Sequence, residues 1–277
     1  MFQKQISEND VIRKNPLVDY GKDRLQQPRI MHRIVWDRFD ITSNRNWGKG
    51  YRAWMEVNGS RLSVNKAEDP RSFVWRDQVW IVLNGCVQGD GVMCNRKMFL
   101  HNCDTNNTIQ LKIEGQSRRE KNWSPLIWKD ELYFVYSVDP FTLLKPDIES
   151  GFCKLVYGTM KNQGGHHKIC NGTPYLPWNG VFVGFCHTRR PYYAVPTKIN
   201  IEKKTVRFYN KIVFKKPEGA KWHQGAPGPI QFPYHLKINN TNVELSIDFD
   251  DHYPTILTIG LRAFRQQFSE SKGCKFL

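Results

Sequence analysis

The chain has 277 residues, of which 40% are hydrophobic and 13% aromatic, enough to bury the core of one large β domain. Its formal net charge is +15, yet Lys and Arg are spread along the chain and no zinc-finger, helix-turn-helix or RNP pattern appears. This pattern argues against a nucleic-acid partner and favours a small ligand that carries phosphate. No apolar run approaches the roughly 20 residues of a membrane span, and the first residues do not resemble a signal peptide. We therefore expect a cytoplasmic protein without a membrane span.

The cysteines support the same expectation. Their odd number, seven, and the lack of any Cys-x-x-Cys pair argue against a disulfide framework and a zinc site. We expect them to be reduced and mostly structural, and we predict neither a bound metal nor a cofactor. The residues concerned are Cys86, Cys94, Cys103, Cys153, Cys170, Cys186 and Cys274.

In chain order, residues 1–30 are polar with little periodicity, which predicts an extended or partly disordered lead-in. Strand-like alternation begins near Ile34, and a strand that runs into an Asn-Gly turn ends at Gly59. The next three segments, residues 68–84, 120–136 and 171–187, repeat one another. Each segment opens with a polar cluster and continues with an apolar strand, a charged or Asn-Gly turn and an apolar-aromatic strand.

Self-similarity at a period of roughly 50 residues is typical of repeated sheets around an axis, as in a propeller. Three further strand patterns, at 230–239, 243–249 and 255–261, fill a last repeat, and a short helix is predicted near 262–268. We therefore predict an all-β chain, with a single five-bladed β-propeller domain over residues 31–277. Since equivalent positions of the blades converge on the central channel, the polar clusters are expected to face one another.

The first cluster is Glu68-Asp69-Pro70-Arg71. Pro70 biases the preceding residue toward extended geometry, which suits a carboxylate projected from the start of an inner strand. Asp69 between Glu68 and Arg71 is thus a candidate general acid or base. The alternative is a strand-initiating turn with a surface ion pair.

In the second cluster, Lys121 and Asn122 are candidates to bind phosphate or sugar hydroxyls, and the alternative is an ordinary blade entry with Trp123 in the core. The third cluster, residues 171–174, is followed by a basic, aromatic strand end. Its side chains are candidates to clamp phosphate oxygens by charge-assisted hydrogen bonds, and the alternative is a solvated basic turn. The residues of that strand end are His187, Arg189, Arg190, Tyr192 and Tyr193.

A final acidic run, residues 248–251, closes a strand of the last repeat. Asp248 or Asp251 is a candidate acceptor for sugar hydroxyls. The remaining ligands of an EF-hand loop are absent, and no Rossmann-like pattern surrounds the run, so neither a calcium loop nor a metal–nucleotide site is predicted.

Taken in order, Glu-Asp-Pro-Arg, Glu-Lys-Asn-Trp-x-Pro, Gly-Thr-Pro with Gly-Phe-Cys-His, and Ser-x-x-Phe-x-Asp resemble the mannoside phosphorylases over roughly residues 40–260. That family consists of five-bladed propellers, with a related branch of β-1,2-mannosyltransferases. The resemblance implies that Asp69 is the catalytic carboxylate, that Lys121 and His187 are phosphate ligands, and that Asp251 contacts the sugar.

The resemblance also implies that a tyrosine after His187, either Tyr192 or Tyr193, belongs to the site, together with Arg52 of the first blade. We add Arg189 and Arg190 to the phosphate or donor subsite. The remaining polar residues of the motifs are assigned to sugar binding: Glu68, Arg71, Glu120, Asn122 and Thr173.

The resemblance implies an inverting reaction, and with these residues we predict a glycosyltransferase of glycan biosynthesis, which moves a sugar from a nucleotide-sugar or sugar-phosphate donor to a glycan acceptor. The first alternative is a glycoside phosphorylase, in which the same groups hold inorganic phosphate. The second is a hydrolase, in which Glu68 or Glu120 activates water. A non-catalytic glycan-binding propeller is the alternative from a different class of protein.

Overall fold

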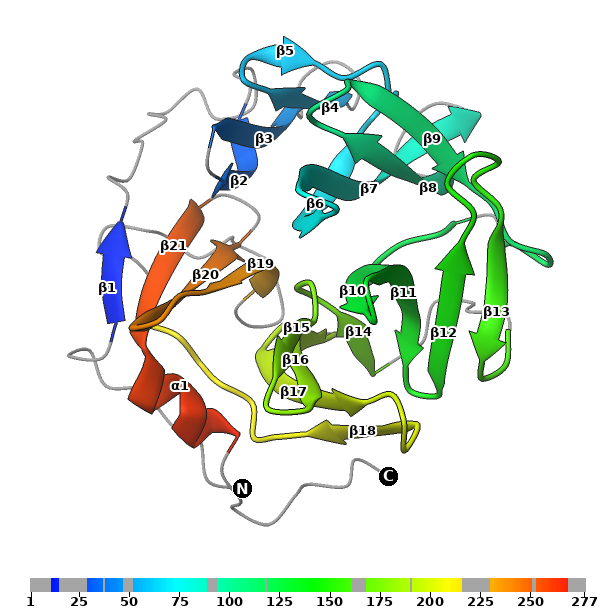
Figure 1. The fold of residues 1–277 in the computed structure, drawn as a ribbon. Helices are drawn as coiled ribbons and strands as arrows, with labels where there is room; N and C mark the ends of the chain where they lie inside the picture. The colour runs from blue at the N-terminus through cyan, green and yellow to red at the C-terminus, as the bar shows by residue number, and fades with distance from the viewer. Residues whose placement is uncertain are drawn as a thin grey trace.

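The structure is a computed structural model that describes residues 11–14, 29–36, 38–46, 52–88, 94–117, 119–160, 168–189, 191–215, 230–250 and 253–268. Five antiparallel sheets surround a central axis, each forming one blade (Figure 1). The first blade contains, from the axis outward, β2 (Arg29–Trp36), β3 (Phe39–Asn46), β4 (Arg52–Val57) and β5 (Ser60–Arg61). The second contains β6 (Glu68–Trp75), β7 (Gln78–Gln88), β8 (Asn95–Asn102) and β9 (Asn107–Leu111).

The third blade contains β10 (Ser124–Trp128), β11 (Glu131–Val138), β12 (Phe141–Pro146) and β13 (Cys153–Tyr157). In the fourth, the inner strand is split into β14 (Ile169–Asn171) and β15 (Leu176–Trp178), followed by β16 (Val181–Thr188), β17 (Ala194–Asn200) and β18 (Thr205–Phe208). The fifth contains β19 (Gln231–Ile238), β20 (Asn242–Phe249), β21 (Tyr253–Gly260) and, outermost, β1 (Val11–Lys14). The all-β, five-bladed propeller predicted from the sequence is therefore confirmed.

The predicted division between a lead-in over residues 1–30 and a propeller from residue 31 stays a prediction. Within that lead-in, β1 pairs with β21, and β2 already begins at Arg29. The two ends of the described chain therefore meet in one sheet, which closes the ring of blades.

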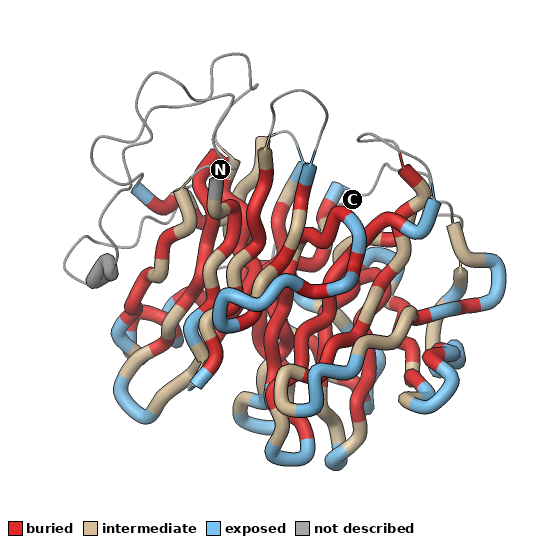
Figure 2. The backbone as a smooth tube through the Cα atoms, turned by 90° about the horizontal axis from the view of Figure 1, so that it is seen from above, coloured by how far each residue is buried: buried red, intermediate tan, exposed pale blue. Residues whose placement is uncertain are grey.

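Packing between blades explains the long apolar runs in the second strand of each blade. In β7, residues 79–86 are buried without interruption, and in β11 residues 132–138 are buried. Both faces of these strands contact neighbouring blades, so the usual alternation of buried and exposed residues disappears. Figure 2 shows the buried residues along the strands and the exposed ones at the turns.

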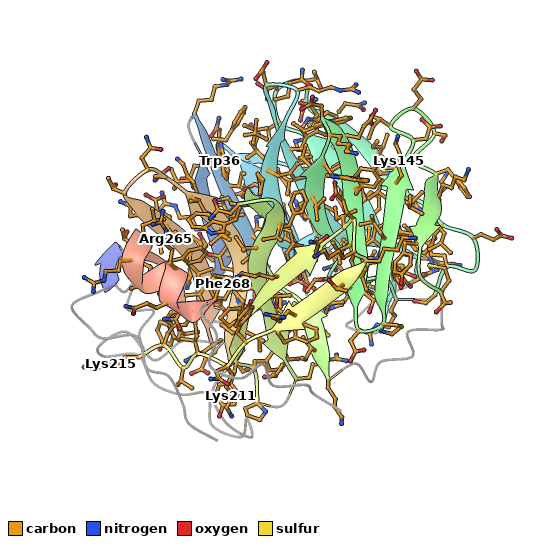
Figure 3. All side chains as sticks on the ribbon, turned by 60° about the horizontal axis from the view of Figure 1, so that its bottom comes forward. Trp36, Lys145, Lys211, Lys215, Arg265 and Phe268 are labelled. Atoms are coloured by element: carbon orange, nitrogen blue, oxygen red, sulfur yellow. A yellow bond between two sulfur atoms is a disulfide. The ribbon has the colours of Figure 1, made fainter. Side chains whose placement is uncertain are left out.

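The short helix predicted near residue 262 is confirmed as α1 (Leu261–Gln267). It lies against the outside of the last blade (Figure 1) and presents Phe264 to Phe185, with ring centroids 6.1 Å apart. Phe268, which follows the helix, packs edge-to-face on Tyr209 at 5.5 Å, while Arg265 lies on the outer side over the ring of Trp178 (Figure 3). No helix in the described part of the chain is long and apolar enough to cross a membrane.

A disulfide joins Cys86 and Cys94. Pairing of β7 with β8 brings their Cα atoms to 5.9 Å, within the range that a disulfide spans. The prediction of seven reduced cysteines is therefore wrong for this pair. Strand pairing brings the two cysteines together although they are eight positions apart and form no Cys-x-x-Cys motif. A structural disulfide is rare in a reducing cytoplasm, so the cysteines no longer support the predicted cytoplasmic location, which stays a prediction.

Candidate active site

The polar clusters that open the second, third and fourth blades meet at one end of the channel, where Arg71 joins them. Its guanidinium donates to the carbonyl oxygens of Gly172 (2.5 Å) and Asn171 (3.2 Å) and to Oδ1 of Asn122 (3.1 Å). Asn171 donates through Nδ2 to the carbonyl oxygen of Asn122 (2.9 Å). The expected convergence of the clusters is therefore confirmed. The donors of Arg71, a predicted sugar ligand, are engaged within the protein.

Asp69 lies in a β-bulge of the inner strand β6, where the register with β7 shifts between Glu68 and Arg71. Its φ is +53°, which residues with side chains rarely adopt, so the extended geometry predicted before Pro70 is wrong. A bulge re-aims one side chain out of the strand's alternation. Asp69 accordingly stays partly exposed between two buried neighbours, and its Oδ2 accepts a hydrogen bond from Nδ2 of Asn84 (2.9 Å).

Positive charges surround the Asp69 carboxylate. Burial opposes its ionisation, but the charges of Lys121, Arg71 and Arg45 outweigh burial and hold the pKa of Asp69 well below its ordinary value. Lys121 is the strongest of these charges, and it comes from the polar cluster of the neighbouring blade. The site therefore combines an ionised carboxylate with the charge of a partly exposed lysine from the neighbouring blade.

The two glutamates of the clusters differ from Asp69 because both are buried and paired. Oε1 of Glu68 accepts a hydrogen bond from Nη2 of Arg45 (3.1 Å), and Oε2 forms an ion pair with Nη1 of Arg96 (2.9 Å). Glu120 accepts from the Ser117 backbone N–H (2.8 Å) through Oε1 and from Nε1 of Trp123 (3.2 Å) through Oε2. Their assigned contacts with sugar stay predictions, and both carboxylates already serve the packing of their blades.

Two buried imidazoles contact Phe232, which lies on the inner strand β19. The ring centroids of His32 and His187 are 5.7 and 4.6 Å from that of Phe232. Burial lowers the pKa of His32 to about 4 and that of His187 to about 3, so both are neutral at pH 7. His187 therefore carries no positive charge at pH 7, and its predicted contact with a phosphate stays a prediction. The ring of Tyr192 stacks on it, with centroids 5.4 Å apart and an angle of 12°.

The remaining predicted site residues differ in their exposure and in their contacts with the residues around Asp69. Arg189 is exposed; burial and then Arg71 are the main causes that lower the pKa of His187, and the charge of Arg189 adds a smaller effect in the same direction. Tyr193 is half-buried, with Nζ of Lys211 at 4.2 Å from its ring centroid.

Thr173 is buried and its hydroxyl is used locally, accepting from the Phe185 backbone N–H (2.9 Å). Arg52 is exposed at the start of β4, the third strand of its blade, and so lies away from the inner strands. Arg190 and Asp251 lie outside the described residues.

Sequence reasoning missed His32, Arg45, Asn84 and Arg96. His32 lies at the margin of the segment interpreted as a lead-in, whereas Asn84 and Arg96 belong to the second and third strands of their blade. The signal available was a polar residue inside an apolar run, as at Asn84 after Leu83, because a buried polar side chain needs a partner. Among the described residues, no group of three or more His, Cys, Asp and Glu is placed to hold a metal ion.

No protein-family model matches the chain. A stretch of 158 residues is 25% identical to Beta-mannosyltransferase 2 of Komagataella phaffii, covering 53% of this chain and 22% of that protein. The chain thus matches about a fifth of the length of this relative.

Solved structures extend the likeness over most of the chain. A candidate glycoside hydrolase from Bacteroides ovatus superposes with a TM-score of 0.57 at 10% identity, covering 85% of this chain and 87% of that one. A mannose phosphorylase from Leishmania mexicana in complex with phosphate superposes with a TM-score of 0.56 at 6% identity, covering 96% of this chain and 88% of that one. A GDP-Man-dependent mannosyltransferase from the same organism superposes with a TM-score of 0.51 at 8% identity, covering 90% of this chain and 92% of that one.

The chain has their fold. The resemblance to the mannoside phosphorylases and their mannosyltransferase branch, stated above from four motifs, is thereby confirmed for the architecture. At these identities the likeness establishes the fold, and the chemistry has to be argued from the side chains.

Proposed function

We propose that this protein is an inverting mannosyltransferase that moves a sugar from a nucleotide-sugar or sugar-phosphate donor to a glycan acceptor. The observation that carries the proposal is one partly exposed carboxylate, Asp69, beside the ammonium of Lys121. The mannosyltransferases among the similar proteins support the choice of sugar and reaction.

In the proposed reaction, Asp69 takes the proton of the acceptor hydroxyl, directly or through a sugar hydroxyl. The acceptor oxygen bonds to the anomeric carbon on one face while the bond to the donor phosphate breaks on the other. The departing phosphate keeps the bonding electron pair, and Lys121 and Arg189 stabilise its charge, with His187 donating a hydrogen bond. A general base must be deprotonated, which agrees with the depressed pKa of Asp69.

A glycoside phosphorylase is the second candidate, because a neutral His187 and a single lysine suit one inorganic phosphate, the ligand bound in the similar Leishmania phosphorylase. That direction requires Asp69 to carry a proton for the leaving sugar, which the surrounding cations disfavour in the free protein. A hydrolase gains less support, since Glu68 and Glu120 are engaged by neighbouring donors. A non-catalytic binding module does not require an ionised carboxylate surrounded by cations, as found at Asp69.

The test is calorimetry with GDP and with inorganic phosphate, followed by a transfer assay that detects nucleoside diphosphate release from GDP-mannose. We expect GDP to bind more tightly than phosphate, and replacement of both Tyr192 and Tyr193 by Ala to narrow that difference. The physical reason is that stacking of a base on an aromatic ring contributes about 1–3 kcal/mol. Tight phosphate binding without any binding of a nucleoside diphosphate would overturn the transferase and promote the phosphorylase.

A further inference from the structure

A chain of hydrogen bonds runs from the third strand of the second blade, β8, to the Asp69 carboxylate on β6. Arg96 donates through Nη1 to Oδ1 of Asn84 (2.5 Å), and Asn84 donates through Nδ2 to Oδ2 of Asp69 (2.9 Å). Arg96 is itself fixed by Glu68, at 2.9 Å. Glu68, Asn84 and Arg96 are all buried.

This order of donors and acceptors leaves Asn84 one orientation. An arginine side chain only donates, so Oδ1 of Asn84 must face Arg96 and the amide Nδ2 must face Asp69. The backbone adds rigidity, because Asn84 and Arg96 each lie two residues from a cysteine of the Cys86–Cys94 disulfide.

Asp69 needs such an external restraint. Its φ of +53° and its place in a bulge leave it outside the regular pairing of β6 with β7. Unusual backbone geometry persists only where surrounding contacts over-determine it. The hydrogen bond from Asn84 fixes Oδ2, which leaves Oδ1 for a reacting hydroxyl.

We propose that Asn84 is a positioning residue for Asp69, held in its single working orientation by Arg96 and Glu68. This rests on the proposed function only in naming Asp69 as the reacting carboxylate. This chain of contacts also gives Glu68 of the Glu-Asp-Pro-Arg motif a role other than sugar binding: its two carboxylate oxygens pair with Arg45 and Arg96, and Arg96 orients Asn84.

The proposal makes a claim about the ionisation of Asp69 that a packing role for Asn84 does not make. A hydrogen bond to the ionised form lowers a carboxyl pKa, and a second carboxylate at hydrogen-bond distance raises one pKa of the pair strongly. The other charged or titratable groups that act on Asp69 remain the same in each variant. They are Lys121 before β10, Arg71 on β6, Arg45 on β3, His32 on β2 and His187 on β16.

The experiment compares Asn84→Ala and Asn84→Asp with the wild-type protein and with Asn102→Ala. Asn102 is a matched control: a buried asparagine of the same blade, it donates to Oε1 of Gln78 (2.9 Å) and accepts from the Asp104 backbone N–H at the other end of the sheet. The first readout is NMR titration of the Asp69 carboxyl carbon, identified by its loss in Asp69→Asn. This readout needs no substrate and stands whether or not the protein transfers a sugar.

In Asn84→Asp we expect a carboxyl pair with an upper apparent pKa of about 5 or more, because two carboxylates in contact do not both ionise readily. Asn102→Ala should leave Asp69 unchanged. If the folded Asn84→Asp protein shows no raised carboxyl pKa, the proposal is overturned. Because this side chain is nearly isosteric and still accepts from Arg96, it carries the test even where Asn84→Ala fails to fold.

The second readout is kinetic. Asn84→Ala should lower kcat by about 10-fold to 100-fold with KM within about twofold, because a misplaced reacting group costs rate more than binding. Wild-type kcat in Asn84→Ala would refute the positioning role. A wild-type protein without transfer activity would instead refute the proposed function and leave the titration to decide the role of Asn84.

Discussion

The two ends of the inner strands are built on different principles. At one end, β6, β10 and β15 each finish with a tryptophan and a two-residue turn, and both turn residues have positive φ, as at Arg76-Asp77, Lys129-Asp130 and Asn179-Gly180. These are the conformations that two-residue hairpins require. Arg76 lies over the ring of Trp75 at 4.3 Å, and Lys129 over that of Trp128 at 4.7 Å.

At the other end, regular pairing gives way to a bulge and to side chains that reach between blades. Arg71 contacts Gly172 and Asn171, which are 101 and 100 positions away in the sequence. Asp69 there is held by charges from three different blades. Local turn rules therefore determine one end of the propeller, whereas contacts between distant residues determine the end with the candidate chemistry.

The largest effect that would test this division is that of Asp69→Asn. The change keeps the shape and removes the proton acceptor, so we expect a loss of about 10²–10⁴-fold in rate, typical of general acid–base groups. Donor binding, measured by calorimetry, should change little, whereas the free energy of unfolding at pH 7 should fall, because the surrounding cations stabilise the ionised carboxylate in the folded state. Full activity of the variant would make Asp69 a turn residue, like Asp77 at the opposite end.

The buried histidines of the site should make the protein sensitive to mild acid. His32 and His187 have folded-state pKa values of about 4 and about 3, lowered chiefly by burial, whereas unfolded histidine titrates near 6.5. The unfolded state therefore binds more protons below pH 6.5. Stability is complete above that pH and is lost as the pH falls toward 4, by about 1.4 kcal/mol per pH unit for each histidine.

Urea denaturation at a series of pH values between 4.5 and 7.5 checks this. His32→Asn should reduce the slope of unfolding free energy against pH by the contribution of one histidine. Asn102→Ala, which removes no titratable group, should leave the slope unchanged. An unchanged slope in His32→Asn would mean that this imidazole is not kept neutral by burial.

A smaller effect distinguishes the two lysines that lie at opposite ends of the same inner strand. Lys121→Ala removes the strongest positive charge on Asp69, so we expect nucleoside diphosphate to bind about 10-fold to 100-fold more weakly, since hydrogen bonds to charged groups contribute about 1.5–3 kcal/mol. The same change should raise the pKa of Asp69. Unaltered affinity in calorimetry would remove Lys121 from the phosphate subsite.

How much the sequence predicts follows the same division. The tryptophan-turn-aromatic repeat is local, so it identified three blades and their turns. Local strand patterns before and after the repeat predicted the other two blades, and a separate periodic segment predicted the short helix. The convergence of the polar clusters also followed from the repeat, because equivalent positions of blades share one end of the channel.

The individual side-chain contacts at the end with the candidate site could not be predicted from the sequence. Whether Glu68 or Asp69 faces the channel depends on a bulge, and a one-residue shift moves a side chain to the other face. Arg45 and Arg96 come from second and third strands, where no motif marks them, and their partner Glu68 lies 23 and 28 positions away respectively. The Cys86–Cys94 bridge likewise depends on the pairing of two strands rather than on cysteine spacing.

The smallest expected effect belongs to Lys129→Ala, the counterpart of Lys121→Ala at the turn end. Lys129 is exposed, and its contact with Trp128 is a surface cation–π interaction, so its loss should lower the free energy of unfolding by about 0.5–1 kcal/mol. Alanine keeps a Cβ at φ +51°, so the backbone cost of the turn is the same in both proteins and cancels from the difference. Urea denaturation measures the loss, and calorimetry with GDP should find unchanged affinity. A fall in affinity that matched Lys121→Ala would show that general positive charge, rather than the arrangement around Asp69, attracts the diphosphate.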